Sequence, residues 1–113
     1  VMSYYSFRPR KTFNADLARL GKLDPSIIDD IHEAIDILLN GDVLPKEYRD
    51  HNLQRKYAGY REFHVRDTPK GAKPTKTNDV LVIYKIDHQD LVLVAVRAGS
   101  HNILFNKGYR KNK

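Results

Sequence analysis

The chain of 113 residues contains no cysteine and no tryptophan. The lack of cysteine excludes a disulfide framework, a thiolate metal site and a cysteine nucleophile. No stretch approaches the roughly 20 apolar residues that a membrane-spanning helix needs, and the segment Val1–Tyr5 lacks the charged and apolar regions of a secretion signal. The sequence therefore predicts one soluble, cytoplasmic domain over residues 1–113, with a single core.

The charge of the chain is unevenly distributed. Residues 1–50 hold seven Lys/Arg and nine Asp/Glu, a net of −2, whereas residues 51–113 hold thirteen and five, a net of +8. The basic tail, residues 106–113, supplies four of these positive charges. A basic half favours a polyanionic partner such as a nucleic acid, because each neutralised phosphate releases counterions. A basic surface that only keeps the protein soluble explains the charge equally well.

Two helices are predicted in the N-terminal part of the chain, after a short strand over residues 4–8. Apolar residues recur at helical spacing within residues 12–21, which predicts the first helix. In the second, Asp24 can cap the N-terminus, Pro25 suits the first turn and Gly41 ends the helix. One wide apolar stripe of this second helix is formed by Ile27, Ile28, Ile31, Ala34, Ile35, Leu38 and Leu39.

From residue 59 onward the apolar period changes from about 3.6 to about 2 residues, which indicates a sheet. Two β-branched runs, at residues 80–86 and 91–96, are joined by the polar residues 87–90, which are typical of a hairpin loop. Residues 67–78 predict a longer loop between two strands. The strand over residues 59–66 is predicted to place Arg61, Phe63 and Val65 on one face and Tyr60, Glu62, His64 and Arg66 on the other.

A strand, two helices and three further strands, in that order, predict an α+β fold. Its two N-terminal helices are expected to pack on one face of a mainly antiparallel four-stranded sheet. The opposite face is left for function. The polar residues of 60–66, the residues around His51 and the segment 97–105 can converge on that face.

Three histidines of the basic half stand beside acidic, glycine or aromatic residues: His51, His64 and His101. Histidine can give and take protons near neutral pH, and an arginine such as Arg97 suits phosphate oxygens. RNA carries its own nucleophile in the 2′-hydroxyl, so an enzyme needs only to move two protons and stabilise charge on phosphorus. These residues indicate metal-free acid–base cleavage of RNA.

The same residues can also have ordinary structural roles. A single histidine in a sheet protein is more often a surface group, Phe105 alone would be core packing, and Arg97 can pair with a carboxylate. A non-catalytic basic nucleic-acid-binding module explains the charge. A metal-dependent hydrolase would use His51, His64, His101 and an aspartate as ligands, although no His-x-His or His-Glu-x-x-His pair is present.

Several separated motifs resemble the YafQ branch of the RelE-like bacterial toxins, in the same order and at similar spacing. They are Leu44–Gln54, Gly59–Val65, Asp79–Lys85 and Arg97–Phe105. The resemblance implies a RelE-like, microbial ribonuclease-type fold. It also implies a ribosome-dependent messenger-RNA endonuclease (an mRNA interferase) that inhibits translation by cutting the messenger in the ribosomal A site. A toxin that has lost catalysis is the alternative.

The resemblance also implies the active-site residues. We expect His101 to act as the acid, His64 or Asp79 as the base, and His51 as a positioner or alternative base. We expect Arg97 to bind phosphate oxygens and Phe105 to stack on a base. The full set carried over from the family is His51, His64, Asp79, Arg97, His101 and Phe105.

Two departures from the family pattern affect this set. The family's acidic residue follows its strand almost directly, whereas here about a dozen residues intervene, so Asp67 remains an alternative to Asp79. Val80 stands where YafQ has a tryptophan, and Tyr57 or Tyr60 can supply that aromatic contact instead.

Partners are expected on the basic half of the chain. The resemblance implies a DinJ-like antitoxin that covers it, a ribosome carrying A-site messenger RNA as substrate, and binding of the toxin–antitoxin complex to operator DNA through the antitoxin. No metal, cofactor or membrane contact is expected. Additional contacts with RNA or the ribosome are predicted for Tyr57, Tyr60, Arg61, Lys107, Arg110 and Lys111.

Overall fold

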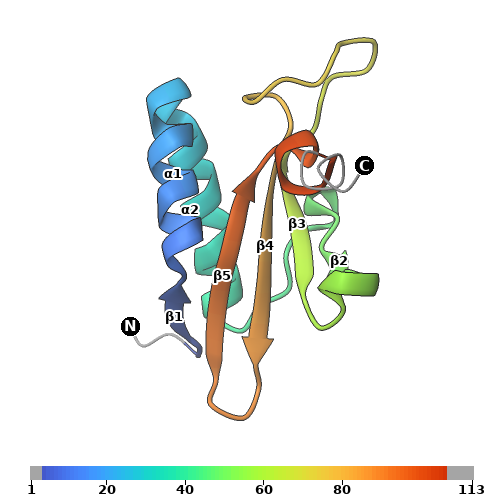
Figure 1. Ribbon diagram of the computed structural model, residues 1–113. Helices are drawn as coiled ribbons and strands as arrows, with labels where there is room; N and C mark the ends of the chain where they lie inside the picture. The colour runs from blue at the N-terminus through green and yellow to red at the C-terminus, as the bar shows by residue number, and fades with distance from the viewer. Residues whose placement is uncertain (1–3, 107–113) are drawn as a thin grey trace.

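The computed structural model describes residues 4–106. The fold is α+β, with two helices on one face of a five-stranded mixed sheet of order β1-β5-β4-β3-β2 (Figure 1). Within the described residues, no helix has the length and apolar content needed to cross a membrane. The elements are β1 (Ser6–Pro9), α1 (Lys11–Leu23), α2 (Pro25–Leu39), η1 (Lys46–Tyr48), β2 (His51–Asn52), η2 (Arg55–Tyr57), β3 (Arg61–Arg66), β4 (Val80–Asp87), β5 (Val92–Gly99) and the π-helix η3 (Asn102–Asn106).

The sheet differs from the predicted four-stranded, mainly antiparallel sheet, and that part of the prediction is wrong. β1 pairs in parallel with β5, with Ser6 opposite Val92, so the sheet is mixed. A fifth strand, β2, pairs with β3 and places His51 opposite Glu62. A strand of two residues shows no periodicity, which is why the sequence pattern does not reveal it. The added strand brings His51 to the edge of β3.

The second helix begins and ends as predicted. The side chain of Asp24 accepts a hydrogen bond from the backbone N–H of Ser26 at 3.0 Å, and Pro25 occupies the first turn. At the other end Gly41 adopts a positive φ of 83° and its N–H donates to the carbonyl of Leu38 at 2.9 Å. A glycine reaches this left-handed conformation without a steric penalty, which explains why the helix stops there.

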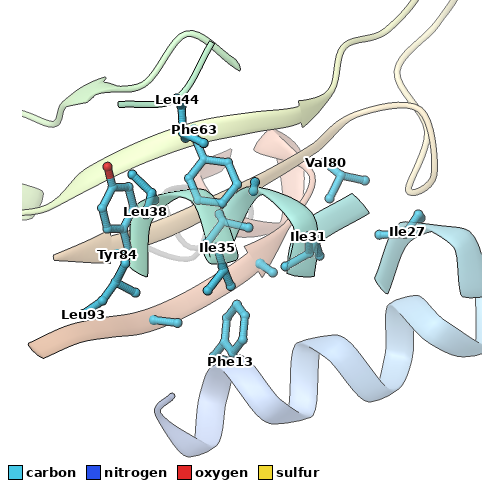
Figure 2. Packing of buried hydrophobic residues seen from close by; sticks show 14 of the residues in the cluster. Phe13, Ile27, Ile31, Ile35, Leu38, Leu44, Phe63, Val80, Tyr84 and Leu93 are labelled. Atoms are coloured by element: carbon cyan, nitrogen blue, oxygen red, sulfur yellow. The ribbon is translucent and has the colours of Figure 1, made fainter. Parts of the chain in front are cut away.

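The main core lies between the helices and the sheet (Figure 2). Phe13 of α1, Ile31 and Ile35 of α2, and Phe63 of β3 are buried there. The face of the sheet opposite the helices is called the open face below. It carries a smaller apolar cluster, whose buried members are Leu81, Ile83, Val92, Val94, Val96 and Leu104.

A register shift between β3 and β4 follows His64 and changes the face on which the next residues lie. Arg66, which the alternation places beside His64, instead turns to the helix side, so that prediction is wrong. Its guanidinium pairs with Asp30 and Asp24, each at 2.9 Å. Glu62 and His64 precede the shift, and both are buried.

Along the C-terminal half of β5, from Val96 onward, side chains of α1 take the place of a neighbouring strand. β1 ends at Pro9, and beyond it Thr12 Oγ1 donates to the carbonyl of Val96 at 2.6 Å. The N–H of Ala98 donates to Asp16 Oδ2 at 2.9 Å. These bonds satisfy backbone groups that would otherwise be unpaired at the sheet edge, and they hold β5 in place just before His101.

Candidate active site

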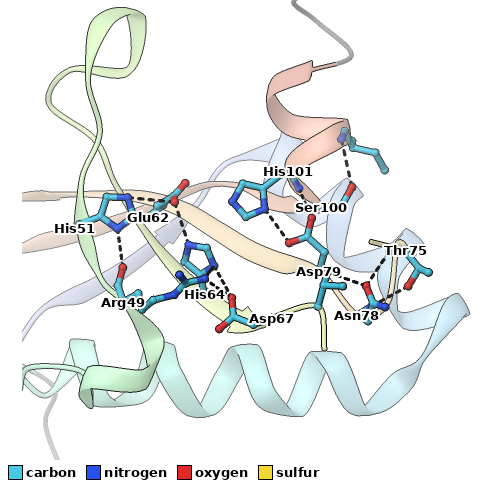
Figure 3. A network of polar contacts seen from close by, with 12 residues as sticks. Arg49, His51, Glu62, His64, Asp67, Thr75, Asn78, Asp79, Ser100 and His101 are labelled. Atoms are coloured by element: carbon cyan, nitrogen blue, oxygen red, sulfur yellow. Dashed lines mark hydrogen bonds and ion pairs between the residues drawn. The ribbon is translucent and has the colours of Figure 1, made fainter. Parts of the chain in front are cut away.

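Three histidines that are far apart in the sequence meet on the open face (Figure 3). His51 comes from β2, His64 from β3, and His101 from the segment between β5 and η3. The ring centroids of His51 and His64 lie 6.2 Å apart, and those of His64 and His101 lie 5.2 Å apart. The structure therefore brings together the three histidines that the sequence singled out.

His101 is held by Asp79 through two contacts. Its ring Nδ1 lies 2.8 Å from Asp79 Oδ1, and its backbone N–H donates to Asp79 Oδ2 at 2.9 Å. An ionised carboxylate only accepts, so Nδ1 carries a proton and Nε2 is left for chemistry. The Asp79 side chain is 8% exposed and the His101 side chain 44%. A buried carboxylate thus orients a ring that a substrate can reach.

Glu62 lies between two of the histidines, and its role was missed from the sequence. Its Oε2 atom lies 3.2 Å from Nε2 of His51 and 3.2 Å from Nε2 of His64. Its Oε1 atom is buried and has no hydrogen-bond partner among the described residues. The period-2 alternation does place Glu62 beside His64, and that shared face is the signal that could have identified it.

His64 is engaged at both ring nitrogens. Nδ1 lies 3.0 Å from Asp67 Oδ1 and 3.1 Å from Nη2 of Arg49, and Arg49 and Asp67 form an ion pair. Arg49, a second residue missed from the sequence, ends η1 in the left-handed conformation at φ 50°. The side chain of His64 is only 6% exposed. It is an enclosed ring rather than one open to a substrate.

The surroundings favour a charged pair at the centre of the site. The hydrogen bond to Glu62 raises the pKa of His64, although burial and the charge of Arg49 oppose the change. Burial raises the pKa of Glu62, but the hydrogen bond from His64 and the charges of His51, His64 and His101 bring it below its usual value. Opposite charges in contact therefore outweigh the cost of burial.

His51 is the second exposed histidine of the site. Its Nδ1 donates to the backbone carbonyl of Arg49 at 2.6 Å, so the other nitrogen, Nε2, faces Glu62. Its side chain is 49% exposed. The cluster therefore offers two accessible rings, His51 and His101, with the buried His64 between them.

The sequence left Asp67 and Asp79 as alternative carboxylates, and the structure places both at histidines. Asp67 contacts His64 and Asp79 contacts His101. The two residues flank the long β3–β4 loop, which projects beyond the sheet in Figure 1. Thr68 and Asn78 close the base of this loop through a side-chain hydrogen bond of 3.1 Å. The insertion thus separates the two carboxylates in sequence while its base keeps them close to the cluster.

Aromatic side chains continue from the cluster along the open face. The ring of Phe105 lies 6.2 Å from that of His101 and 5.5 Å from that of Tyr57. Tyr57 in turn lies 6.3 Å from Tyr60. All three aromatic rings are partly exposed. Phe105, Tyr57 and Tyr60 are therefore placed where they could stack on bases.

Arg97 lies at the margin of the site. The strand register puts it in one cross-strand row with Ile83 and Glu62 on the open face. Its guanidinium, however, turns to α1, where Nε and Nη2 donate to the carboxylate of Asp16 at 2.7 and 3.2 Å. The hydrogen bond to Asp16 raises the pKa of Arg97. Asp16 is a further residue missed from the sequence, because no local pattern connects it with β5.

The remaining predicted contacts are not brought to the histidines. Arg61 lies on the helix side of β3, where its guanidinium binds Asn52 at 2.7 Å and Asp50 at 3.2 Å. It shares that face with Phe63, so strand alternation separates it from His64. The other three predicted contacts, Lys107, Arg110 and Lys111, lie outside the described residues.

The cluster has two chemical capacities. Its two exposed imidazoles can exchange protons with a substrate. Its buried carboxylate and imidazoles can also hold a cation, because ligand atoms of Glu62, His64 and His101 all lie within 4.8 Å of one another.

Comparison with known proteins identifies the family. The family described as the bacterial toxin of type II toxin–antitoxin system, YafQ, matches residues 5–106. A protein of Haemophilus influenzae named as a YafQ toxin is 33% identical over 82 residues, which cover 71% of this chain and 70% of that protein. The family match thus includes nearly all of the described residues.

Solved structures agree with this match. The DinJ–YafQ toxin–antitoxin complex of Escherichia coli matches with a TM-score of 0.68 and 27% identity, over 90% of this chain and 98% of that chain. A metal-bound toxin from Helicobacter pylori matches with a TM-score of 0.73 and 30% identity, over 89% and 99% of the two chains. From its sequence match and its fold, the chain belongs to the YafQ family of toxins of bacterial type II toxin–antitoxin systems.

Proposed function

We propose that this protein is a ribosome-dependent messenger-RNA endoribonuclease whose active site is the histidine cluster of the open face. The observation that carries the proposal is the Asp79–His101 pair. A buried carboxylate fixes the ring through Nδ1 and leaves Nε2 of an exposed histidine for a substrate. Oriented imidazoles of this kind typically contribute about 10²- to 10⁴-fold to a proton-transfer step.

The proposed reaction uses the 2′-hydroxyl of the RNA as nucleophile. A base removes its proton, the 2′-oxygen forms a new bond to phosphorus, and the bond from phosphorus to the 5′-oxygen breaks. The departing oxygen takes a proton from an acid. The products are a 2′,3′-cyclic phosphate and a 5′-hydroxyl end, and all atoms and protons come from the RNA and the two histidines.

The geometry favours particular roles. His101 is the proposed acid, as the family resemblance implies. His51 is favoured as the base over His64 and Asp79, because its side chain is 49% exposed and within reach of a substrate, whereas the side chains of His64 and Asp79 are 6% and 8% exposed. Protonated His64 would stabilise the negative charge that grows on phosphorus. Arg97 would help to stabilise this charge, either after its guanidinium leaves Asp16 or by contacting the phosphate while it is still bound to Asp16.

The proposed partners follow from the relatives. The Escherichia coli structure contains the antitoxin DinJ, and we propose a DinJ-like antitoxin for this chain. Net charge of +8 in residues 51–113 suits an acidic partner as well as RNA. Dependence on ribosomes would place the reaction in the cytoplasm, with the ribosome fixing the geometry of the messenger.

Cleavage of a messenger by the purified protein, with and without ribosomes, tests the proposal. Cuts that need ribosomes, leave 2′,3′-cyclic phosphate ends and vanish in His101→Ala are the expected result. His32→Ala serves as the matched control, because His32 is exposed on α2, which packs on the opposite face of the sheet from the cluster (Figure 1). A wild-type protein that leaves the messenger intact on ribosomes would contradict the proposal.

As a second candidate function, we propose that Glu62, His64 and His101 hold a transition-metal ion. Two observations support it: the ligand atoms lie within 4.8 Å of one another, and Glu62 Oε1 is buried without a partner among the described residues. The relatives from Helicobacter pylori were solved with a bound metal and, in one mutant, with copper. Imidazole and carboxylate ligands suit zinc and copper. A bound ion would supply a Lewis acid close to the reacting phosphate.

Calorimetric titration with Zn²⁺ and Cu²⁺ separates the two candidates. Binding that is lost in Glu62→Gln supports the metal site. The enzyme alone is also stripped with a chelator before it is mixed with ribosomes. Full cleavage after stripping would show that the acid–base reaction does not need the ion, and absence of binding would reject the metal site.

A further inference from the structure

A row of cationic residues crosses the open face at a distance from the histidines. Arg8 of β1 is paired with Val94 of β5, and Val94 is paired with Lys85 of β4. Partners in register share a face of the sheet, so Arg8 and Lys85 lie on the open face with Val94. With Arg10 they line an open groove of about 420 Å³. This set, Arg8, Arg10 and Lys85, is called the basic row.

The basic row is joined to the active site by the aromatic side chains. The guanidinium of Arg10 and the ammonium of Lys85 lie 5.8 and 5.4 Å from the ring centroid of Tyr60. From Tyr60 the series runs through Tyr57 and Phe105 to His101, each ring within 6.3 Å of the next. Rings and cations thus form one continuous series across the open face.

The basic row is available to an anion. Within residues 4–106, none of its three side chains forms an ion pair, and Arg8 and Arg10 are exposed. The acidic residue of the groove, Asp87, uses its Oδ1 to accept the N–H groups of the following turn at 3.0 and 2.9 Å. In the described part of the chain no ion pair joins Asp87 to the basic row, and three cations against one carboxylate leave the groove with a net positive charge.

We infer that the aromatic series and the basic row form one track for a single strand of RNA, leading from the cleaved bond across the open face to β1. Bases stack on Phe105, Tyr57 and Tyr60, and phosphates lie against the basic row. Alternating rings and cations are the means by which proteins hold single strands without reading their sequence. An acidic segment of an antitoxin would use the cations of the basic row but would not need the aromatic series, so the combination favours RNA.

The track describes how the substrate of the proposed endonuclease is held, so this inference rests on the proposed function. Its chemistry is nevertheless testable by binding alone. Each phosphate contact on a single strand contributes about 0.7 to the slope of log affinity against log salt. Neutralising three cations of the track should therefore lower the magnitude of that slope by about 2.

The experiment compares two triple variants of the full chain in a His101→Ala background that prevents cleavage. The track variant is Arg8→Gln, Arg10→Gln, Lys85→Gln, and the control is Lys22→Gln, Lys46→Gln, Lys70→Gln. The control side chains lie outside the basic row, and the net charge of the two variants is equal. Anisotropy of a labelled single-stranded RNA is measured over a range of KCl concentrations. We expect at least about a tenfold loss of affinity and the smaller slope in the track variant only.

Three results would overturn the track. Equal losses in the two variants would mean that only total charge matters. Unchanged RNA binding with lost inhibition by the antitoxin would assign the surface to that protein. A track variant that retains His101 and cleaves with the wild-type KM would reject the track but leave the endonuclease proposal intact. A wild type that never cleaves, but whose RNA binding depends on the basic row, removes the endonuclease alone.

Discussion

The carboxylate of Asp79 binds His101 twice, through the ring Nδ1 at 2.8 Å and through the backbone N–H at 2.9 Å. The position of the ring and its tautomer are therefore set by the same buried group. A change that keeps the shape of Asp79 but removes its charge should affect chemistry more than folding.

For Asp79→Asn we expect kcat of ribosome-dependent cleavage to fall by about 10²-fold or more with little change in KM, since the ring loses the acceptor that fixes its proton on Nδ1. Single-turnover kinetics on programmed ribosomes would measure this. Asp42→Asn, an exposed carboxylate, is the control. A change in KM with unchanged kcat would show that Asp79 does not act through His101.

Asp67→Asn should have a smaller effect, about tenfold or less in kcat. The side chain of Asp67 is 47% exposed, and Glu62 still holds the other nitrogen of His64 when Asp67 is changed. The same kinetic assay compares the two aspartates directly. Equal losses of kcat for Asp67→Asn and Asp79→Asn would contradict the prediction that the more buried aspartate contributes more to cleavage.

The Glu62–His64 pair makes stability depend on pH. The pKa of His64 is raised above 6.5, so its contribution is complete below pH 6.5 and is lost as the pH rises through the raised value. The pKa of Glu62 is lowered below 4.5, so its contribution is complete above pH 4.5 and is lost as the pH falls through the lowered value. The free-energy difference of unfolding between wild type and Glu62→Gln should therefore be largest between pH 4.5 and 6.5.

Urea unfolding at a series of pH values would measure that difference. Because Glu62→Gln keeps the volume of the side chain, packing changes little and the difference reports the charge. A difference that is the same at every pH would show that the pair contributes by shape alone.

Removing Asp16 should destabilise the fold. This carboxylate is 2% exposed, and it accepts both the N–H of Ala98 and the guanidinium of Arg97. Asp16→Ala leaves these donors unpaired, which costs about 2 to 4 kcal/mol. Denaturant midpoints would show the loss, with Asp36→Ala on the exposed face of α2 as the control. A cost below about 1 kcal/mol would mean that water replaces Asp16 at the sheet edge.

Phe105→Leu should weaken substrate binding rather than chemistry. Leucine keeps much of the apolar volume but offers no flat ring to a base, so we expect KM to rise by about tenfold with kcat nearly unchanged. Phe7→Leu on β1 is the matched control, because Phe7 contacts Phe13 on the helix side of the sheet. An unchanged KM would assign Phe105 to packing against Tyr57.

Local patterns were sufficient to predict the helices and most strands. Asp24, Pro25 and Gly41 mark the ends of α2 because capping depends on residues a few positions apart. The parallel pairing of Ser6 with Val92 joins the first strand to the last strand of the chain's described part, and no local pattern encodes it. The shift after His64 also escapes a strict alternation, which is why the side of Arg66 was predicted wrongly.

The candidate site, like the fold, could be predicted only in part from local sequence patterns. The histidines stood out by their neighbours and by the resemblance to YafQ toxins, and the structure brings them together. Glu62 shares a face with His64 but has no distinguishing sequence context, and Arg49 reaches the site only through the left-handed turn at the end of η1. Contacts such as Arg97 with Asp16 depend on how a helix lies against a distant strand, so they need the folded chain.

The pairing of β1 with β5 also sets an order of events during synthesis. β1 leaves the ribosome before β5, but it cannot pair with its neighbour in the sheet until residues 92–95 have emerged. His101 emerges later still, so a growing chain holds His51 and His64 without the ring that completes the cluster. If translating ribosomes are the target, the ribosome that makes this protein is protected from it until residue 101 has left the ribosome.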